Sequence, residues 1–121
     1  MNESVKFLKE AEIFYIATID GDFPRVRPFG AATEFEGNVY FCTNNHKDVF
    51  RQIIKNPYVE ISAVGKDGHS WIRISGEAVL DSRKEARTAM IKEYPGLKEI
   101  YSESYDAFEV FYLKNINSII Y

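Results

Sequence analysis

Three short turn sequences constrain the fold of this 121-residue chain more than any other feature. They are Asp20-Gly21, Glu36-Gly37-Asn38 and Asp67-Gly68, and each separates two segments that are rich in β-branched and aromatic residues. Glycine accepts a positive φ without steric cost, so these turns favour tight connections between antiparallel strands. The sequence therefore predicts three β-hairpins and a sheet built mainly from antiparallel neighbours.

The segments around these turns determine which strands and helices the chain is expected to form. Strands are expected at about residues 14–19, 23–33, 39–43, 58–64, 70–80 and 108–121, and helices at about residues 2–12, 46–55, 82–93 and 97–101. β-branched and aromatic residues mark the strands, whereas apolar residues spaced three to four apart mark the helices. These elements predict a mainly β fold, a six-stranded antiparallel β-barrel with added helices, in a single domain of residues 1–121.

Proline, glycine and capping residues refine this prediction. Pro24 and Pro28 each remove a backbone donor, so the second strand is expected at an edge of the sheet or with a bulge. Gly76 predicts a bulge or a bend within the fifth strand. The candidate helix caps are Asn2 or Ser4, Asn44 or Asn45, and Ser82 followed three residues later by Glu85.

Composition excludes several classes of protein. The formal net charge of −3 argues against a general nucleic-acid binder, which usually carries a basic surface. Cys42 is the single cysteine, so neither an intramolecular disulfide nor a cysteine-based zinc site is expected. The two histidines have no metal-ligand spacing, and no apolar run reaches the length of a membrane span. A cytoplasmic protein without a metal or a membrane partner is expected.

Cations and hydrogen-bond donors gather on two neighbouring predicted strands. Arg25 and Arg27 are spaced by two residues and therefore share one face of their strand. Thr43 and Asn44 precede a predicted helix start, where Lys47 is electrostatically unfavourable unless an anion lies beside it. Two interpretations remain open at this point: a phosphate-binding site, or a solvated lysine and two surface arginines.

Other candidate residues carry weaker signals. Trp71 and Arg73 share a face of the fifth strand, where Trp71 is either a core residue or a cover for a planar ligand. Cys42 is expected to be a small buried residue, and a nucleophilic role beside His46 is the less favoured alternative. His69 is expected in solvent. No residue is identified as catalytic.

In series, these residues resemble the pyridoxamine 5'-phosphate oxidase-like family of FMN-binding split barrels. The resemblance is strongest to its small single-domain members, which include nitroimidazole-resistance-type proteins. The matching segments are Tyr15-Ile16-Ala17-Thr18, Asp20-Gly21, Pro24-Arg25-Val26-Arg27-Pro28-Phe29, Val39-Tyr40-Phe41-Cys42-Thr43-Asn44, Lys47, Asn56-Pro57 and Trp71-Ile72-Arg73-Ile74-Ser75-Gly76-Glu77-Ala78.

The resemblance implies a homodimer that binds two FMN molecules at its interface. The implied FMN-binding residues are Arg25, Val26, Arg27, Pro28, Phe29, Thr43, Asn44, Asn45, Lys47, Trp71 and Arg73. Trp71 and Arg73 are implied to reach the flavin from the partner subunit. The longer C-terminal segment of true pyridoxamine phosphate oxidases, with its arginine, is not matched, so oxidation of pyridoxamine phosphate is not expected.

Two functions follow as hypotheses. The first is an FMN-dependent oxidoreductase that passes electrons from a nicotinamide donor, NAD(P)H, to a small organic acceptor. The alternative is a non-catalytic module that holds flavin or haem as a sensor or carrier. A third class, a barrel that binds single-stranded nucleic acid on its aromatic residues, is disfavoured by the net charge of −3. Neither the physiological substrate nor the replacement of FMN by haem or a deazaflavin is determined by these residues.

Overall fold

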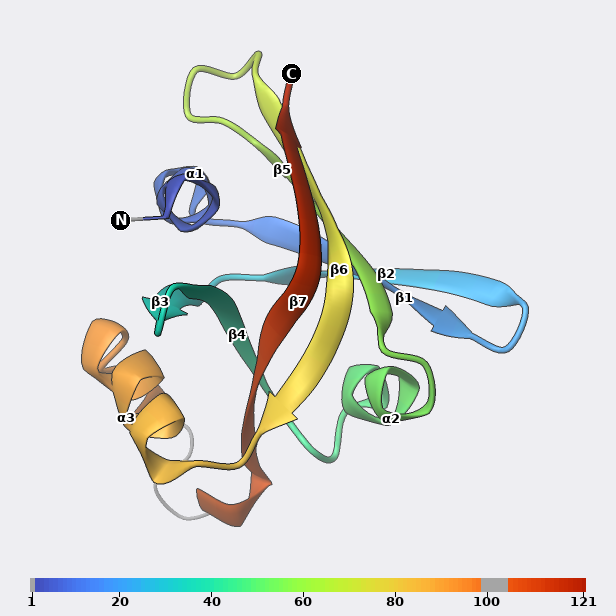
Figure 1. Ribbon diagram of the computed structural model, residues 1–121, viewed down its shortest axis with the longest axis vertical. Helices are drawn as coiled ribbons and strands as arrows, with labels where there is room; N and C mark the ends of the chain where they lie inside the picture. The colour runs from blue at the N-terminus through green and yellow to red at the C-terminus, as the bar shows by residue number, and fades with distance from the viewer. Residues whose placement is uncertain (1, 99–104) are drawn as a thin grey trace.

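One antiparallel sheet dominates the computed structural model, which describes residues 2–98 and 105–121 (Figure 1). The strands are β1 (Phe14–Asp20), β2 (Phe23–Phe29), β3 (Ala32–Phe35), β4 (Asn38–Asn44), β5 (Tyr58–Val64), β6 (Trp71–Asp81) and β7 (Phe108–Ile120). The helices are α1 (Glu3–Ala11), α2 (Asp48–Lys55), α3 (Lys84–Glu93) and the short 3-10 helix η1 (Tyr105–Ala107). The strand order is β2-β1-β5-β6-β7-β4-β3, and all neighbouring pairs are antiparallel.

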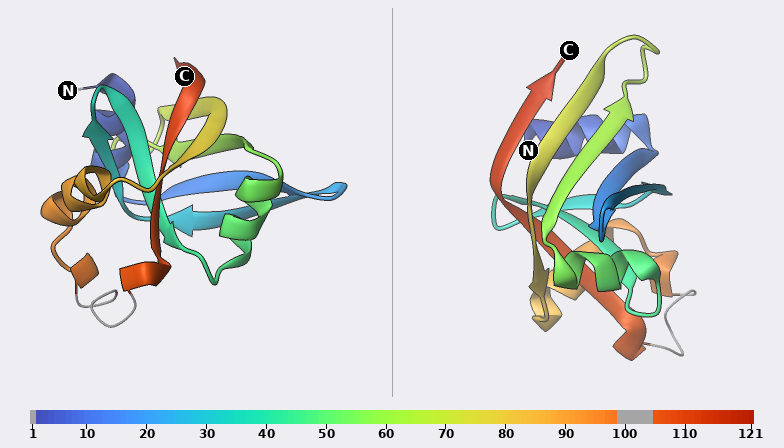
Figure 2. Two further views of the ribbon diagram at one scale, coloured as in Figure 1. Left: turned by 60° about the horizontal axis from the view of Figure 1, so that its bottom comes forward. Right: turned by 90° about the vertical axis from the view of Figure 1, so that its right-hand side faces the viewer.

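The connection between β2 and β3 explains why this sheet curls into a split barrel. These two strands are the opposite edges of the strand order, yet only Gly30 and Ala31 separate them in the sequence. Two residues span only about 7 Å of extended chain, so the two edges of the sheet must approach each other. Figure 2 shows the curled sheet from two further sides, with the β1–β2 hairpin extending beyond the body of the barrel.

The predicted mainly β antiparallel fold with added helices is confirmed, but the predicted number of strands is wrong. The segment 23–33, expected to form one strand, forms two, so the sheet has seven strands in the described part of the chain. The break comes at Gly30 and Ala31, after Phe29 has paired with Phe14, the first residue of β1. The predicted edge position of this proline-containing strand is confirmed, because β2 pairs only with β1.

The core lies inside the curled sheet and extends beneath the helices. Val5 and Leu8 of α1 pack into one buried cluster with residues from the sheet and from α2. A second buried cluster joins α3 to β4 and β7 through residues such as Met90 and Phe108. In Figure 1, α2 and α3 lie at the same end of the sheet, with β4 passing between them. This arrangement brings both helices to the end of β4, where Thr43 lies.

Two local predictions, the cap of the first helix and the bulge in the long strand β6, are confirmed. Asn2 caps α1, because its side-chain oxygen accepts hydrogen bonds from the N–H groups of Ser4 and Val5. The β6–β7 register shifts between Ser75 and Glu77, so the bulge expected at Gly76 is confirmed.

The predicted caps of the next two helices are wrong. Lys47 and Arg83 occupy the N-cap positions of α2 and α3, and neither cap residue makes a side-chain capping hydrogen bond. The short helix expected at 97–101 begins at Leu97, and its remainder lies outside the described residues. Among the helices that are described, none combines the length and the apolar character that a membrane crossing requires.

Candidate functional site

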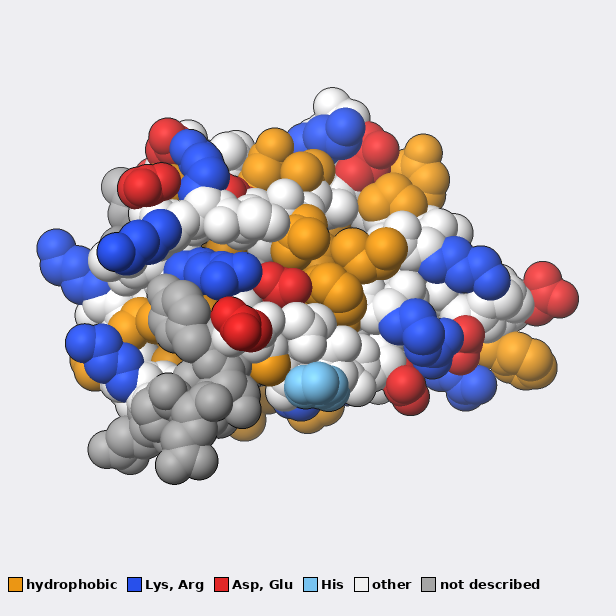
Figure 3. All heavy atoms as spheres, turned by 90° about the horizontal axis from the view of Figure 1, so that it is seen from below, with side chains coloured by type: hydrophobic (Ala, Val, Ile, Leu, Met, Phe, Trp, Pro, Cys, Tyr) orange, Lys and Arg blue, Asp and Glu red, His pale blue; other side chains and the backbone are white. Residues whose placement is uncertain are grey.

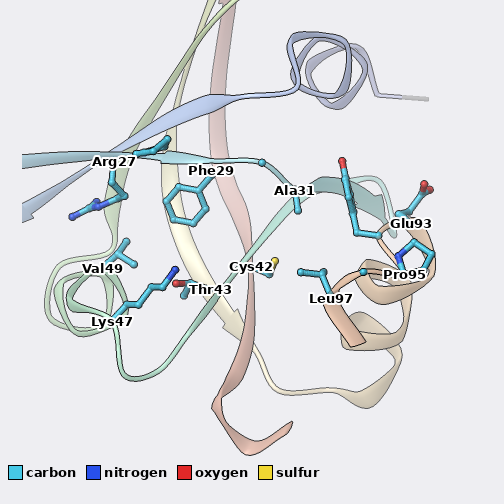
Figure 4. A pocket seen from close by; sticks show the side chains of 14 residues that line it. Arg27, Phe29, Ala31, Cys42, Thr43, Lys47, Val49, Glu93, Pro95 and Leu97 are labelled. Carbon is cyan, nitrogen blue, oxygen red and sulfur yellow. The ribbon is translucent and has the colours of Figure 1, made fainter. Parts of the chain in front are cut away.

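A cavity of about 640 Å³ opens where the β2–β3 junction faces the end of β4 and the ends of two helices (Figure 4). Its volume lies within the range of small-molecule and cofactor sites. The residues that line it are Arg27, Pro28, Phe29, Gly30, Ala31, Cys42, Thr43, Lys47, Val49, Glu93, Tyr94, Pro95, Gly96 and Leu97. Of the residues predicted to hold FMN, five line this cavity, namely Arg27, Pro28, Phe29, Thr43 and Lys47.

A second hollow of about 410 Å³ adjoins the first, because Arg27, Lys47 and Val49 line both. Arg25 and Val26, two further predicted site residues, line this second hollow. Three of the predicted cationic residues therefore surround one region of the surface. Arg25 is exposed there and pairs with Asp20 at 3.4 Å, a contact of small energetic weight in solvent.

Arg27 is held rigidly by groups behind it. Its Nη1 donates to the Ile16 carbonyl at 3.2 Å and to the Thr18 hydroxyl at 2.8 Å, and its Nη2 donates to Gln52 Oε1 at 2.7 Å. Burial lowers the pKa of Arg27, although Asp48 acts in the opposite direction. A guanidinium has five N–H donors, so two are left for a ligand after these three bonds.

Thr43 carries the most direct sign of a missing partner. Thr43 is 3% exposed, and its buried hydroxyl oxygen has no hydrogen-bond partner among the described residues. Buried hydroxyls are almost always paired, because an unpaired one costs about 1–3 kcal/mol. Since Thr43 also lines the cavity, this hydroxyl is positioned for a polar group of a bound ligand.

The start of α2 adds an anion-binding element beside Thr43. No side chain caps this eight-residue helix, so its first N–H groups are available to a ligand. Lys47 at the N-cap is exposed and makes no ion pair among the described residues. Figure 4 shows its side chain pointing toward Thr43. The predicted juxtaposition of Thr43 and Lys47 is therefore present in the structure.

Asn44 and Asn45, which were expected to contact the phosphate, line neither cavity. The Asn44 side chain accepts a hydrogen bond from the His46 N–H at 3.0 Å, which closes the loop before α2. Asn45 Nδ2 donates to the Asp106 carbonyl at 2.9 Å, and the backbone N–H of Asn45 donates to the Ala107 carbonyl. These contacts explain why neither asparagine caps α2, and they fix the loop that presents Lys47.

The opposite end of the cavity is largely apolar. Ala31, Cys42, Pro95 and Leu97 line it, and Figure 4 shows Leu97 pointing toward Cys42. Burial raises the pKa of the Cys42 thiol to about 12, although Lys47 acts to lower it. A thiol with this pKa stays protonated near neutral pH, which contradicts the nucleophilic alternative and agrees with the expected small buried residue.

Trp71 and Arg73 lie at the far end of β6, and within one chain the structure does not bring them to the cavity. The Trp71 ring stacks on Tyr121 with centroids 4.3 Å apart, and the Arg73 guanidinium lies 5.2 Å from the Trp71 ring centre. Arg73 Nη1 also donates to the Tyr121 hydroxyl at 3.1 Å. The cluster is partly exposed, so a contribution to the cavity of a partner subunit stays a prediction.

The sequence did not predict the polar residues that contact Arg27, nor the cavity-lining residues Tyr94 and Leu97 that follow α3. One signal was present: Gln52 stands three residues after Val49, on the buried face of α2, where an apolar residue is expected. A buried polar residue on such a face indicates a hydrogen-bonded network. For Tyr94 and Leu97 the sequence carries no comparable signal, because only the folded chain brings them to β4.

The charge distribution fits a ligand with an anionic group at one end and a flat apolar body. Arg27, Lys47, the α2 N-terminus and the unpaired Thr43 hydroxyl lie at one end. The backbone from Pro28 to Ala31 leads from there to the apolar end. FMN has this composition, with a phosphate and a ring system, so the residues present fit the cofactor implied by the resemblance.

Comparison with known proteins identifies the family. The family model described as pyridoxamine 5'-phosphate oxidase matches residues 1–113. No curated protein matches the chain. Among solved structures, a NimC/NimA family protein from Clostridium acetobutylicum is 45% identical, with 98% of this chain and 84% of that chain covered and a TM-score of 0.92.

Two more distant structures share the fold. A pyridoxamine 5'-phosphate oxidase-related, FMN binding protein from Nostoc punctiforme is 18% identical, with a TM-score of 0.67 over 89% of this chain and 73% of that one. The heme storage protein HutZ from Vibrio cholerae is 15% identical, with a TM-score of 0.73 over 97% of this chain and 94% of that one.

Proposed function

The chain belongs to the pyridoxamine 5'-phosphate oxidase family, and from this premise we propose that it is an FMN-binding oxidoreductase. The observation that carries the proposal is the buried Thr43 hydroxyl, which has no hydrogen-bond partner among the described residues and lines the cavity together with Lys47, the N-cap residue of α2. A phosphate ester accepts hydrogen bonds from a hydroxyl, an ammonium and the first N–H groups of a helix at once. No ligand without an anionic group uses this arrangement equally well.

In the proposed complex, the phosphate is held at the cationic end of the cavity. Lys47 and the two free N–H donors of Arg27 supply positive charge, and Thr43 supplies a short hydroxyl donor. A phosphate monoester carries a charge of about −1.5 to −2 at neutral pH, so two cations balance it. Thr18 and Gln52 keep the guanidinium of Arg27 oriented before the ligand arrives.

Bound FMN would supply two-electron redox chemistry, with a nicotinamide donor and a small organic acceptor as the proposed reactants. The chain's own residues would position the ring and exclude water from it. Phe29 is fixed for this purpose, because its ring stacks on Phe14 at 6.0 Å and meets the edge of Phe41 at 5.7 Å. None of the described cavity residues is proposed as a proton donor or acceptor.

A homodimer is proposed because the sheet leaves an apolar outer face uncovered. Val26, Tyr15, Val64 and Ile119 are 41–67% exposed, and the strand register places them on the outward side of β2, β1, β5 and β7. Trp71 and Tyr121 continue this face. Such a set of exposed apolar side chains is typical of a protein–protein interface.

Haem is the less favoured ligand for this cavity. Haem iron in proteins takes an axial His, Cys thiolate, Met or Tyr ligand. Among the described residues that line the cavity, Cys42 and Tyr94 are the ones with such side chains. The Cys42 thiol is protonated near neutral pH, and the Tyr94 hydroxyl donates to the Ala32 carbonyl. The donor set therefore supports flavin over haem as the resident group.

The proposed function is tested on the protein as purified from a host that supplies both flavin and haem. The expected result is a flavin absorbance spectrum, release of FMN identified by mass, and bleaching of the flavin band by NADH or NADPH without oxygen. A stable flavin band that neither nucleotide bleaches would contradict the oxidoreductase role. A haem spectrum, or a colourless protein that takes up no FMN, would contradict the FMN assignment itself.

A further inference from the structure

The apolar end of the cavity is closed by a wall that no part of the barrel itself supplies. Tyr94, Pro95, Gly96 and Leu97 follow α3 directly and line the cavity opposite Ala31. Tyr94 and Leu97 also pack against the second core cluster, so the wall is continuous with the interior. Its position determines how far a ligand held at the cationic end extends along the β2–β3 junction.

Tyr94 anchors this wall to the sheet by two hydrogen bonds with one residue. Its hydroxyl donates to the Ala32 carbonyl at 3.0 Å and accepts from the Ala32 N–H at 3.3 Å. Ala32 begins the edge strand β3, directly after the Gly30-Ala31 segment that lines the cavity. The hydroxyl therefore fixes the wall and the opposite lining segment relative to each other.

Helix α1 makes a second set of contacts with the end of α3 and the start of the wall. Glu93, the last residue of α3, pairs with Lys9 of α1 at 2.9 Å. The Lys9 ammonium also lies 5.8 Å from the centre of the Tyr94 ring. Among the described residues that line this end of the cavity, Glu93 is the one charged residue, and it is an acid, whereas the cations Arg27 and Lys47 lie at the opposite end.

We propose that Tyr94 is a positioning residue that closes the apolar end of the cavity, so that this end takes the uncharged ring of the ligand and rejects its anionic group. The proposal rests on the proposed FMN binding and deepens it. Without the Tyr94 hydroxyl, the wall segment is no longer fixed to Ala32. Binding of the ring must then order this segment, and the entropy lost in ordering it weakens binding. This loss of binding free energy concerns the ring and not the phosphate, because the phosphate contacts lie at the other end of the cavity.

The test compares FMN with riboflavin, which has the same ring and no phosphate, by fluorescence titration of the ligand-free protein. For Tyr94→Phe we expect the affinities for both ligands to fall by the same factor, about fivefold, as for loss of one or two ordinary hydrogen bonds. Leu97→Trp, which narrows the cavity without removing the Tyr94 hydroxyl, is expected to weaken both ligands, and the melting temperature is measured beside it. Lys98→Ala, an exposed neighbour outside the cavity lining, serves as the matched control.

The outcomes separate this inference from the proposed function. If the wild-type protein binds neither flavin, the proposed function fails and the inference fails with it. If the wild-type protein binds both flavins and Tyr94→Phe and Leu97→Trp bind them equally well, the inference alone is overturned. A loss confined to FMN would also overturn it, because that result would place the phosphate at the wall.

Discussion

At the scale of single residues, the polar groups of the site differ in whether the protein satisfies their hydrogen bonds. Arg27 makes three hydrogen bonds to the protein, so its position does not depend on a ligand. Thr43 is more deeply buried than Arg27, yet its hydroxyl has no hydrogen-bond partner among the described residues. This contrast distinguishes residues that build the site from residues that await the ligand.

Thr43→Val is expected to have opposite effects on stability and on binding. Removing an unpaired buried hydroxyl should raise the free energy of unfolding of the ligand-free protein by about 1 kcal/mol. The same change should weaken FMN binding by about fivefold or more, since a hydroxyl donor to the phosphate is lost. Urea unfolding and FMN titration measure the two effects. A variant that is destabilised without FMN would show that Thr43 has a partner within the protein.

Asp81 supports a prediction about acid stability. It accepts hydrogen bonds from Arg83 and from the buried Tyr40 hydroxyl at 2.7 Å, and these contacts, Arg83 first, lower its pKa from 3.8 to about 2. A lowered pKa contributes stability that is complete above pH 3.8 and is lost as the pH falls toward 2.

Asp81→Asn should therefore lower the free energy of unfolding by about 1–3 kcal/mol at pH 7 and flatten its decline between pH 4 and pH 2. Urea unfolding at several pH values measures both effects. Asp22→Asn, in the exposed β1–β2 turn, is the control and should change neither. An unchanged acid dependence in Asp81→Asn would contradict the lowered pKa.

At the scale of elements, the bulge in β6 lies in the middle of the sheet, where β6 pairs with β7. The register shift at Gly76 lies in the long strand that pairs with β5 on one side and β7 on the other. A Cβ atom at Gly76 would lie 3.1 Å from the Lys114 carbonyl oxygen, closer than most Cβ contacts in proteins. The bulge therefore favours glycine, because any side chain at this position would press on the backbone of β7.

Gly76→Ala should lower the free energy of unfolding by about 1–3 kcal/mol, because the backbone of β7 has to move. Gly96→Ala is the matched control, since a Cβ there meets nothing within 4 Å. We expect that control to stay within about 0.5 kcal/mol of the wild type. Thermal and urea unfolding of the two variants test the prediction, and equal stabilities would contradict a crowded bulge.

Element by element, the sequence predicted what depends on local chemistry. The hairpin turns, the edge position of β2 and the bulge at Gly76 follow from residues that act on their own backbone. The split between β2 and β3 was not predicted, because it arises when two sheet edges meet across the barrel. The cap of α2 was not predicted either, since Asn45 bonds to residues about sixty positions away.

At the scale of the whole molecule, the cavity and the uncovered apolar face share strand β2. Val26 lies on the outer face and in the second hollow, one residue from Arg27. In Figure 3, one face of the molecule shows basic side chains in separate groups toward its two ends, with hydrophobic side chains between them. That face therefore lacks a continuous basic patch of the kind that nucleic-acid binders present. These features support a dimer with sites near its interface.

Ile119→Glu is expected to convert the proposed dimer into a monomer. The side chain is 41% exposed on the outer face of β7, and a charge there would be buried without a partner on dimerisation. A loss of at least a hundredfold in dimer affinity is expected, about 3 kcal/mol. Ile54→Glu, on α2 and 55% exposed, is the control and should remain dimeric. Sedimentation velocity measures both, and a wild-type monomer that retains FMN would contradict the proposed interface.

How much of the candidate site was predictable also depends on scale. Lys47, Thr43 and the strand of Arg25 and Arg27 follow from the sequence, because each lies next to a strand end or a helix start. The wall at Tyr94 and the network of Gln52 do not, because their partners are distant in the sequence. Local chemistry thus predicts most of the cationic end of the site, and tertiary packing supplies the apolar end.

The central claim, a phosphate held at Lys47, is tested most directly by titrating FMN and riboflavin into the wild-type protein and Lys47→Ala. We expect the wild type to bind FMN more tightly than riboflavin. We expect Lys47→Ala to weaken FMN by about 10- to 150-fold, the equivalent of about 1.5–3 kcal/mol for a charge-assisted contact, with riboflavin affinity unchanged. Equal affinities of the wild type for the two ligands, or an equal loss of both in Lys47→Ala, would contradict the claim.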